Sequence, residues 1–347
     1  MKLNSGQLYF FTEQDIKTGQ RTCNYKIGIV READGRDSKD RLLEHQTGNP
    51  RKLVVEAVLD KVPAVEYVET NLHHLFARNR IMGEWMEFTP AELQIAIAKA
   101  SELKAEMEAN LPDYKKAEEL KKVISNGIKI APTHDSQYWF EEILTFKEII
   151  ETCKVALAKY DDYLYVAIEQ GVSAPGVAKV QKRAGAKKFD EGMLKANYPA
   201  LYEKYSSTTS EIKGSFRLAS SENFVPDISS LTSEQVMLVT DFVELLENAD
   251  PSLDTGFVLH EKHLAVLEVL QYAEYRKDIA DAKLRVLTGD NEGIEGICTW
   301  KREEKFTTIL DKKELQKKHP DEFNSCIVEG KATEALIVDP KVAEAII

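Results

Sequence analysis

Two aromatic-rich stretches near the N-terminus constrain the fold of this chain most strongly. Leu8-Tyr9-Phe10-Phe11 is followed, after a polar segment containing Thr18-Gly19-Gln20, by Asn24-Tyr25-Lys26-Ile27-Gly28-Ile29-Val30. Aromatic and β-branched residues favour strands, and the polar segment between them is typical of a turn. We therefore expect a β-hairpin at the start of the fold.

The residues that follow predict a helix, a strand and a second helix. The first helix is expected from about Ser38 to His45, with Ser38 or Asp40 as its N-cap, and it ends before Gly48-Asn49-Pro50. Residues 53–59 (LVVEAVL) are typical of a strand. The second helix can begin at Pro63, and its apolar residues recur at helical spacing: Val65, Val68, Leu72, Leu75 and Phe76. Residues 1–98 are therefore predicted to form a module with the order β-β-α-β-α.

Composition sets the broad class of protein. The chain has 347 residues, 43% of them hydrophobic, which is enough for two or three domains with ordinary cores. No apolar run approaches the roughly 20 residues that span a bilayer, and the polar start lacks the features of a signal peptide, so we expect a soluble, cytoplasmic protein. The four cysteines are far apart, which indicates reduced thiols rather than disulfides or a zinc site.

The formal net charge of -12 argues against a protein that simply coats nucleic acid, because such affinity comes mainly from Lys and Arg facing phosphates. Residues 1–100 carry 14 Lys+Arg and 14 Asp+Glu, so the whole excess of negative charge lies in residues 101–347. A neutral N-terminal module on an acidic body can still bind DNA through a local basic patch.

The motifs of the N-terminal module, in this order, resemble the GIY-YIG nuclease superfamily, and in particular its phage-type subfamily with a Tyr-Lys-Ile-Gly strand. Leu8-Tyr9 corresponds to the first motif and Tyr25-Lys26-Ile27-Gly28 to the second. The resemblance covers residues 7–90 and includes Arg41-Leu42 with His45, Gln46-Thr47-Gly48-Asn49-Pro50, Glu69 with Leu72, His73 and Phe76, and Gly83-Glu84-Trp85. It implies an α+β fold in which helices flank a central antiparallel sheet, and it implies cleavage of DNA.

The chemistry of phosphodiester hydrolysis explains these residue types. The reaction needs a nucleophilic water, a cation for the charge growing on the phosphate oxygens, and help for the leaving oxygen. Arg41 supplies a permanent, forked cation. Glu69 can bind one Mg²⁺ or Mn²⁺ through a hard oxygen ligand, with water and phosphate completing the shell. His45, one helical turn after Arg41 and on the same face, is a candidate proton carrier or phosphate contact.

The resemblance further implies that a strand tyrosine activates the water or assists proton movement, either Tyr9 or the group on the second strand. The chain departs here from the parent pattern, because Lys26 takes the place of the second tyrosine and Tyr25 lies one position earlier. Neighbouring strand residues face opposite sides of a sheet, so only one of the two can point into the site. The register favours Lys26, and Tyr25 remains the alternative. Gln7 replaces the first glycine of the pattern, at a position where only the backbone matters.

Some residues of the motifs also have structural interpretations. Glu66 competes with Glu69 as the functional carboxylate. His73 and His74 are more readily explained by packing or hydrogen bonding than by metal binding. Gly83-Glu84-Trp85 is predicted to be the closing strand of the module, with Trp85 in the core.

The remainder of the chain is predicted to be mainly helical. Residues 99–135 are expected to form a charged helical linker, a hairpin or stalk interrupted at Pro112. Residues 136–170 predict one or two amphipathic helices within a region 136–225. The C-terminal domain, residues 226–347, is expected to contain a long helix at about 259–287 and a short β-hairpin with Thr299-Trp300-Lys301.

A basic stretch in this region resembles the second helix of a helix-turn-helix motif. Gly171 would lie at the bend and Pro175 in the first turn of that helix. The helix would present the densest basic patch of the acidic part of the chain, consisting of Lys179, Lys182, Arg183 and, just beyond it, Lys187. We expect this patch to contact DNA, although non-binding helical hairpins share the same pattern.

Two later segments repeat one pattern. Asp190, Leu194, Tyr198-Pro199 and Tyr202 recur with the same spacing as Asp311, Leu315, His319-Pro320 and Phe323. Each copy predicts a capped helix stopped by proline and then a second short helix. The second copy, with the helix and hairpin before it, resembles the C-terminal tail of phage exonucleases of the YqaJ recombinase family, over about 80 residues. No catalytic core of that type is evident upstream.

The sequence thus supports two hypotheses. The first is a metal-dependent DNA endonuclease of phage or mobile-element type, with Tyr9, Lys26 or Tyr25, Arg41, His45 and Glu69 in the site and the C-terminal region targeting it to DNA. The second is a catalytically inactive module that binds nucleic acid or a protein in recombination or in phage defence or counter-defence. A protein partner or a homo-oligomer would fit the acidic body.

Overall fold

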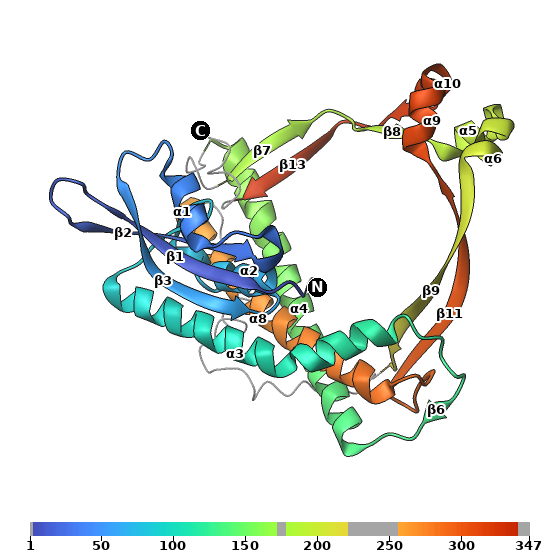
Figure 1. Ribbon diagram of the computed structural model, residues 1–347, viewed down its shortest axis with the longest axis horizontal. Helices are drawn as coiled ribbons and strands as arrows, with labels where there is room; N and C mark the ends of the chain where they lie inside the picture. The colour runs from blue at the N-terminus through green and yellow to red at the C-terminus, as the bar shows by residue number, and fades with distance from the viewer. Residues whose placement is uncertain (1–2, 172–177, 221–255, 339–347) are drawn as a thin grey trace.

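The computed structural model describes residues 3–171, 178–220 and 256–338, and it has the predicted α+β fold (Figure 1). At the N-terminus lies a five-stranded sheet of order β3-β1-β2-β5-β4. Its strands are β1 (Gly6–Gln14), β2 (Arg21–Arg31), β3 (Lys52–Val62), β4 (Arg80–Met82) and β5 (Trp85–Glu87). Helices α1 (Ser38–Gln46) and α2 (Val65–Leu75) complete the predicted order β-β-α-β-α, which is confirmed.

The sheet is antiparallel, and β1 pairs with both β2 and β3. Alternation along a strand sends neighbouring side chains to opposite faces. Leu8, Phe10 and Ile27 therefore face one layer of the core, and Tyr9 and Phe11 face the other.

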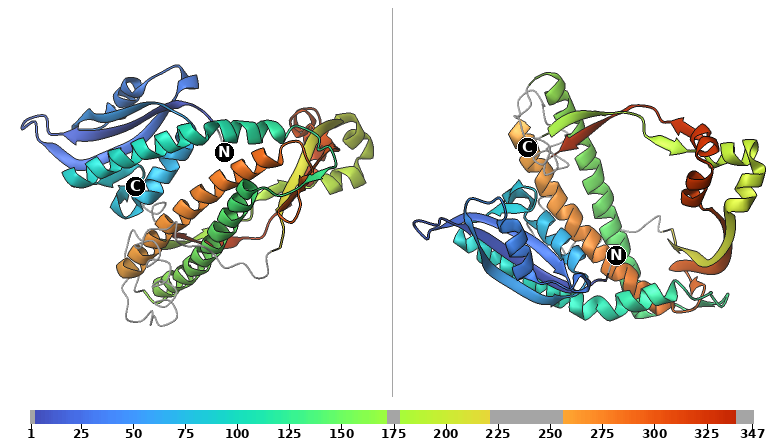
Figure 2. Two further views of the ribbon diagram at one scale, coloured as in Figure 1. Left: turned by 90° about the horizontal axis from the view of Figure 1, so that it is seen from below. Right: turned by 45° about the horizontal axis from the view of Figure 1, so that its top comes forward.

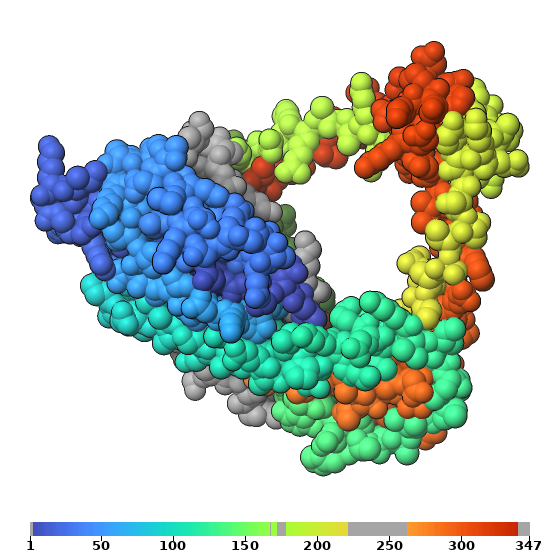
Figure 3. Space-filling view, in the orientation of Figure 1, coloured from blue at the N-terminus to red at the C-terminus, as the bar shows by residue number. Residues whose placement is uncertain are grey.

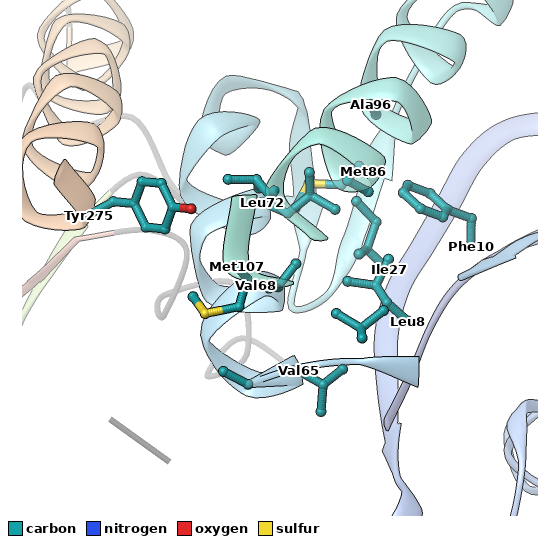
Figure 4. Packing of buried hydrophobic residues seen from close by; sticks show 14 of the residues in the cluster. Leu8, Phe10, Ile27, Val65, Val68, Leu72, Met86, Ala96, Met107 and Tyr275 are labelled. Atoms are coloured by element: carbon teal, nitrogen blue, oxygen red, sulfur yellow. The ribbon is translucent and has the colours of Figure 1, made fainter. Parts of the chain in front are cut away.

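Helices α2 and α3 (Pro90–Leu120) cover the first face and form the largest apolar cluster with it (Figure 4). Helix α8 (Gly256–Thr288), far away in the sequence, adds Tyr275, whose ring points toward α2 in this view. Helix α1 covers the opposite face through Leu42. The sheet therefore lies between two helical layers, one of which is completed by the C-terminal half of the chain.

Two local predictions in this module need correction. The N-cap of α1 is Asp37, not Ser38 or Asp40, since the Asp37 carboxylate accepts hydrogen bonds from the backbone N–H of Lys39 and Asp40. Three residues of capping type occur close together, and only the extended backbone at Asp37 selects among them. The closing strand β5 exists, but alternation places Met86 in the core and leaves Trp85 half-buried.

Helix α3 runs from Pro90 to Leu120 without a break, so the interruption predicted at Pro112 is wrong, and of the two alternatives, a hairpin or a stalk, the hairpin is excluded. A proline inside a helix removes one hydrogen bond and crowds the preceding turn. The helix nevertheless continues because Met107 before the proline and Tyr114 after it are buried in the same core. The predicted domain boundaries remain a prediction, although α3 continues across the first of them.

Helices α4 (His134–Glu169) and α8 pack along each other and form the base of the molecule (Figure 2). Phe140 near the start of α4 packs with Leu284 near the end of α8, whereas Tyr160 packs with Ala265 at the other end. The two helices are therefore antiparallel, and the predicted amphipathic segment 136–170 forms one helix, which ends at Glu169.

Two β-ribbons extend from the two ends of this base (Figure 1). Ribbon 1 pairs β7 (Ala178–Arg183) with β13 (Thr333–Val338), and β8 (Lys187–Phe189) with β12 (Ile327–Glu329). Ribbon 2 pairs β9 (Ser206–Leu218) with β11 (Cys298–Leu310) over the full length of both strands. At its root β11 pairs with β10 (Gly293–Ile294), the predicted hairpin, and β10 pairs with β6 (Lys129–Ile130).

The predicted helix-turn-helix is wrong, because Lys179, Lys182 and Arg183 lie in strand β7. Pro175 lies outside the described residues. Val180 alternates with charged residues, and it pairs with Leu336 of β13. A partner strand so distant in the sequence supplies the ladder of hydrogen bonds, and local propensity gave no sign of it.

The repeated pattern forms the tip that joins the two ribbons, and its prediction is confirmed. The four short helices of the tip are α5 (Glu191–Asn197), α6 (Pro199–Tyr205), α9 (Lys312–Lys318) and α10 (Pro320–Ser325). Asp190 and Asp311 cap the first helix of each pair by accepting from Met193 and Glu314 N–H. Leu194 and Leu315, each fully buried, belong to one shared apolar cluster.

The two copies are related by an internal two-fold axis. Asp190 N–H donates to Cys326 O at 2.8 Å, and Asp311 N–H donates to Tyr205 O at 2.9 Å, the same bond with the copies exchanged. The pair Phe189 and Ile327 in ribbon 1 likewise corresponds to the pair Leu310 and Ser206 in ribbon 2. The strand before each copy therefore pairs with the strand after the other copy.

Base, ribbons and tip form a ring around an opening that passes through the molecule in the space-filling view (Figure 3). Residues 178–218 leave the base along ribbon 1, cross the tip and return along ribbon 2. Residues 298–338 make the same passage in the opposite sense. Both passages cross the tip as continuous chain.

Candidate active site

Tyr9 lies at the centre of the candidate site, on the face of the sheet that α1 covers. Its ring is 1% exposed and stacks on Phe11, with ring centroids 3.9 Å apart. Gly28 is its partner on β2, and a Cβ there would lie 2.5 Å from the Tyr9 hydroxyl oxygen. The glycine of the second motif is therefore needed because the tyrosine of the first motif occupies the space above it.

Helix α1 brings two further residues to Tyr9. His45 Nε2 lies 3.4 Å from the Tyr9 hydroxyl, and the Arg41 side chain also hydrogen-bonds this hydroxyl. Arg41 and His45 are four residues apart, so both lie on the face of α1 that meets the sheet. Arg41 is held from the other side by Glu44, whose carboxylate accepts from Arg41 Nη1 at 2.5 Å.

The surroundings set the protonation of these groups. Burial, together with the negative charge of Glu84 and against the opposing effect of Arg41, raises the pKa of Tyr9 to about 12. Burial lowers the pKa of His45, with further lowering by the cations Lys26 and Arg41. At neutral pH Tyr9 is therefore a neutral hydroxyl that faces an uncharged imidazole.

Lys26 and Tyr25 face opposite sides of the sheet. The Tyr25 ring belongs to the core on the α2 and α3 side, where it packs against Phe88. Lys26 lies on the other side, in a cleft that it lines together with His45. The structure thus places Lys26 in the site, as its register indicated, and Tyr25 away from it.

Glu84, predicted from sequence only as part of the closing strand, is a member of the site. Its carboxylate forms an ion pair with Lys26. Burial raises the pKa of Glu84, but the hydrogen bond and the charge of Lys26 outweigh it, so the pKa is lowered overall. The Gly83-Glu84-Trp85 motif was itself the signal that could have identified this residue.

Helix α2 reaches the site along the edge of β2. His73, on α2, hydrogen-bonds Ile27 O of β2 through Nε2 at 3.1 Å, and Arg80 Nη2 donates to its Nδ1 at 2.6 Å. Burial and the Arg80 cation lower the pKa of His73 to about 4, so it is a neutral, structural residue. Glu69 lies one turn before His73 on the same helix face, and it is therefore brought beside the same strand.

The structure separates the roles of Glu69 and Glu66. Glu66 accepts hydrogen bonds from Asn4 Nδ2 and Arg31 Nε, which tie α2 to the end of β2. Glu69 has no such bond within the described part of the chain, and it lines a cleft together with Glu84 and His74. Burial and the negative charge of Glu84 together raise the pKa of Glu69 to about 7.

The ion pair of Lys26 and Glu84 stands between two clefts. Lys26 and His45 line one cleft, whereas Glu69 and Glu84 line the other. Both Glu69 and Glu84 raise the pKa of Tyr9, which places the two carboxylates within electrostatic reach of the same hydroxyl. Tyr9, Arg41, His45, Lys26 and Glu69 therefore form one constellation with Glu84.

This constellation fits a single divalent cation better than a dense metal centre. Within residues 3–171, 178–220 and 256–338, no three His, Cys, Asp or Glu side chains are grouped as a metal site. Mg²⁺ is commonly bound by one or two carboxylates, with water and phosphate as its other ligands. Glu69, with free oxygen atoms facing a cleft, is suited to that role.

The predicted basic patch does not join this site. Lys179, Lys182 and Arg183 lie in ribbon 1, and so does Lys187. Lys182 is paired with Glu334 of the opposite strand at 3.2 Å.

Comparison with known families bears on this geometry. Residues 6–101 match the T5orf172 domain. This domain is phage-associated and related to the GIY-YIG nuclease-like fold, so a phage-type nuclease or DNA-binding domain is supported for the N-terminal module. The comparison gave no direct GIY-YIG match and no support for the YqaJ resemblance of the C-terminal residues. No curated protein and no solved structure matches the chain.

The T5orf172 match covers β1 to β5 and the first part of α3, which includes every residue of the constellation. The base, ribbons and tip lie outside it. Among the described helices, none combines the length and the apolar composition that a membrane crossing requires.

Proposed function

We propose that this protein is a metal-dependent endonuclease that hydrolyses phosphodiester bonds of DNA, of phage or mobile-element type. The observation that carries the proposal is the convergence of Tyr9, Arg41 and His45 on one face of the sheet, with Glu69 beside the neighbouring strand edge. The match of residues 6–101 to the T5orf172 domain supports it. The C-terminal region would target the T5orf172 domain to its substrate.

In this proposal the residues of the domain have distinct roles. Arg41 binds the scissile phosphate through its forked guanidinium, and Lys26 adds a second cation on the same face. His45, uncharged at neutral pH, takes the proton of the Tyr9 hydroxyl, with which it is already in contact at 3.4 Å. The Tyr9 oxygen accepts in its place one proton from the attacking water, so that one proton in all moves from the water to His45.

Glu69 would hold Mg²⁺ or Mn²⁺, with its ionised carboxylate as the protein ligand. When bound, such a cation offsets the charge that develops on the phosphate and leaving oxygens. Glu84 keeps Lys26 in place through the ion pair and contributes negative charge beside Glu69.

The test is cleavage of supercoiled and linear DNA by purified protein with Mg²⁺ or Mn²⁺. Nicked or shortened products are expected with the wild-type protein and are expected to be lost, by 10²-fold or more, in Arg41→Ala and Glu69→Ala. Lys17→Ala and Glu102→Ala are matched controls on exposed positions of the same module and of α3, and they should cleave normally. Equal activity of all variants would remove the proposed site.

One observation favours the second hypothesis, an inactive binding module. Lys26 replaces a motif tyrosine and is engaged by Glu84. This hypothesis expects DNA or protein binding without cleavage under any divalent metal, and binding that is unchanged in Arg41→Ala and Glu69→Ala. The same panel of variants therefore decides between the two.

A further inference from the structure

The cleft that Lys26 and His45 line also has an apolar wall. It has a volume of about 510 Å³, and three of its lining residues come from β4 and β5, namely Ile81, Met82 and Trp85. Ile81 and Met82 are exposed, and Trp85 is half-buried. The catalytic roles proposed above leave this apolar surface unused.

Strand pairing places the Trp85 side chain on the face of the sheet that holds the candidate site. Trp85 of β5 is directly opposite Lys26 of β2, and residues directly opposite each other in antiparallel strands project from the same face. Met82 of β4 is in turn opposite Trp85. Among the residues that the structure describes, no other aromatic ring packs on the Trp85 indole. The indole therefore offers a flat apolar surface beside a cation.

An unused amide lies in the same cleft. Asn24 is two residues before Lys26 on β2, so its side chain is on the same face of the sheet. The other amide of the cleft, Asn49, is already engaged, because Nδ2 donates to Glu13 and Oδ1 accepts from the Arg51 N–H. The Asn24 amide forms no hydrogen bond with any part of the chain that the structure describes. Its two donors and its acceptor are therefore available to a ligand.

The cleft adjoins the groups that are proposed to act on the phosphodiester. His45 lines it and lies 3.4 Å from the Tyr9 hydroxyl. The ion pair of Lys26 and Glu84 separates it from the cleft of Glu69. A phosphate held at Lys26 therefore has the proposed metal site on one side. On its other side is an apolar cleft within reach of the adjoining nucleotide.

The size and chemistry of this cleft fit a single nucleobase. Bases are planar and stack on aromatic side chains, and amides can bond their polar edges. Clefts of roughly 300–1,000 Å³ hold small molecules, so a cleft of about 510 Å³ accommodates one nucleotide and not a double helix. The net charge of -12 limits the attraction of phosphates, which leaves more of the affinity to contacts with bases.

We propose that this cleft binds an unpaired nucleobase next to the scissile phosphate, with the base stacked on the Trp85 indole and its edge hydrogen-bonded to Asn24. This inference rests on the proposed function, since it names the form of DNA that the same site selects. The substrate is DNA with an unpaired nucleotide at the cleavage position. A fully paired duplex is disfavoured, because one of its bases must first leave the stack.

The experiment compares three DNAs of one sequence by fluorescence anisotropy, in the presence of a chelator so that no cleavage occurs. They are a fully paired duplex, the same duplex with one unpaired nucleotide, and that duplex with an abasic nucleotide at the unpaired position. We expect the unpaired base to be bound about tenfold more tightly than either of the other two. The abasic form separates recognition of the base from flexibility of the backbone. Equal binding of the unpaired and abasic forms would overturn the proposal.

Substitutions of Trp85 test the stacking surface. Trp85→Leu keeps an apolar side chain without a ring, and it should lower the affinity for the unpaired base by roughly 5- to 150-fold, the effect of one base–aromatic stack. Trp85→Phe keeps a ring and should retain most of the affinity. Tyr138→Ala removes an exposed aromatic ring on α4 and should change nothing. Equal affinities of Trp85→Leu and the wild type would show that the ring does not bind the base.

A second variant keeps the test independent of the packing of β5. Asn24→Ala leaves Trp85 in place, and it should lower the affinity for the unpaired base by roughly 2- to 12-fold and leave that for the abasic form unchanged. 2-Aminopurine at the unpaired position gives a direct readout, because its fluorescence is quenched when it stacks on an indole. Its emission should fall on binding to the wild type and not on binding to Trp85→Leu. Equal emission in the two complexes would refute the stacking.

The outcomes separate this inference from the proposed function. Binding that depends on the unpaired base, without cleavage in any divalent metal, would support the cleft and refute the endonuclease. Cleavage by a protein that binds all three DNAs equally would refute the cleft and leave the endonuclease standing. Absence of binding to any of the three would refute the cleft and would favour a protein partner for the module.

Discussion

Tyr9 owes its position to a residue without a side chain. Its ring is packed between Phe11 and the backbone of Gly28, so the hydroxyl can only point toward α1. Glu69 shows the opposite principle, since no described residue binds its carboxylate, whereas Oε1 of Glu66, three residues earlier, accepts hydrogen bonds from both Asn4 and Arg31. At the scale of single residues, the site therefore depends on the packing that fixes the Tyr9 ring and on a Glu69 carboxylate that no described residue binds.

We predict that Gly28→Ala displaces the Tyr9 hydroxyl, because the new Cβ would lie 2.5 Å from it. Misplacement of a catalytic group by about 1 Å lowers activity by roughly 10²-fold, and the crowding should lower the free energy of unfolding by about 1–3 kcal/mol. DNA cleavage and thermal melts measure the two effects. In a Tyr9→Ala background the same substitution should cost little stability, and a full cost there would show that the clash is with another group.

The raised pKa of Glu69 predicts a pH dependence of metal binding. At pH 6 the carboxyl is mostly protonated, and at pH 8 it is ionised, because burial and Glu84 raise its pKa to about 7. A metal must displace that proton, so Mn²⁺ affinity should rise about tenfold per pH unit below the pKa and level off above it. Calorimetric titration from pH 5.5 to 8.5 measures this, with Glu69→Gln as the control that should show neither tight binding nor pH dependence.

The same pKa predicts an effect on stability. A carboxyl whose folded pKa exceeds its ordinary value of 4.5 binds more protons in the folded state, so stability falls as pH rises from about 4.5 to 7. Glu69→Gln should therefore be more stable than the wild type at pH 8, by about 1–2 kcal/mol, and equal to it at pH 4. Urea unfolding at both pH values checks this, and a destabilised variant at pH 8 would contradict it.

At the scale of elements, the tip shows how a short repeated pattern builds a paired unit. Each copy consists of a capped helix, a proline stop and a second helix, and neither copy buries its apolar side alone. Tyr198 and His319, between the helices, have nearly identical backbone angles, φ -136 with ψ 58 and φ -136 with ψ 62. The two copies therefore have the same backbone geometry between their helices, although their surface charges differ.

Leu194→Ala and Leu315→Ala should destabilise the tip equally, by about 2–5 kcal/mol each, because both leucines are fully buried at corresponding positions of one cluster. Hydrogen exchange of the tip amides measures the local loss. The two substitutions in one chain should cost less than the sum, since they share one cavity. Unequal single losses would show that the two copies pack differently.

At the scale of the whole molecule, the N-terminal module is not an independent body beside the base. Helix α8 contributes Tyr275 to the core of this module. Its Asp278 carboxylate accepts a hydrogen bond from the Tyr67 hydroxyl, and its Gln271 Nε2 donates to Asn71 Oδ1. Arg78 adds a two-bond ion pair to Glu268. The module and the ring are thus held in one orientation through α8.

Tyr275→Ala should therefore destabilise the N-terminal domain, by about 3–5 kcal/mol, although the substitution lies in the C-terminal half of the chain. Hydrogen exchange at β1 and β2 should increase together with that of α8. Tyr138→Phe, at an exposed tyrosine on α4, is the control and should change neither region. Loss of protection in α8 alone would show that the domain is stable without it.

Much of the N-terminal module is determined by sequence alone. The aromatic strands, the turn between them and the helical spacing after Pro63 are local signals, and they predicted the order of elements correctly. The spacing of Arg41 and His45 was sufficient to place both on one helix face, because four residues make about one turn. The two copies of the tip were also predicted, since caps and proline stops act over a few residues.

Tertiary structure decided what local signals do not contain. Lys179 and Arg183 lie in a strand because β13 pairs with them from a distant part of the sequence, and α3 passes through Pro112 because residues on both sides of it share a core. Glu84 entered the site because β5 pairs with β2 beside Lys26. The ring exists because strands before one copy of the repeat pair with strands after the other. Each of these outcomes depends on contacts between segments far apart in the chain, and such pairing is set by shape and burial in three dimensions.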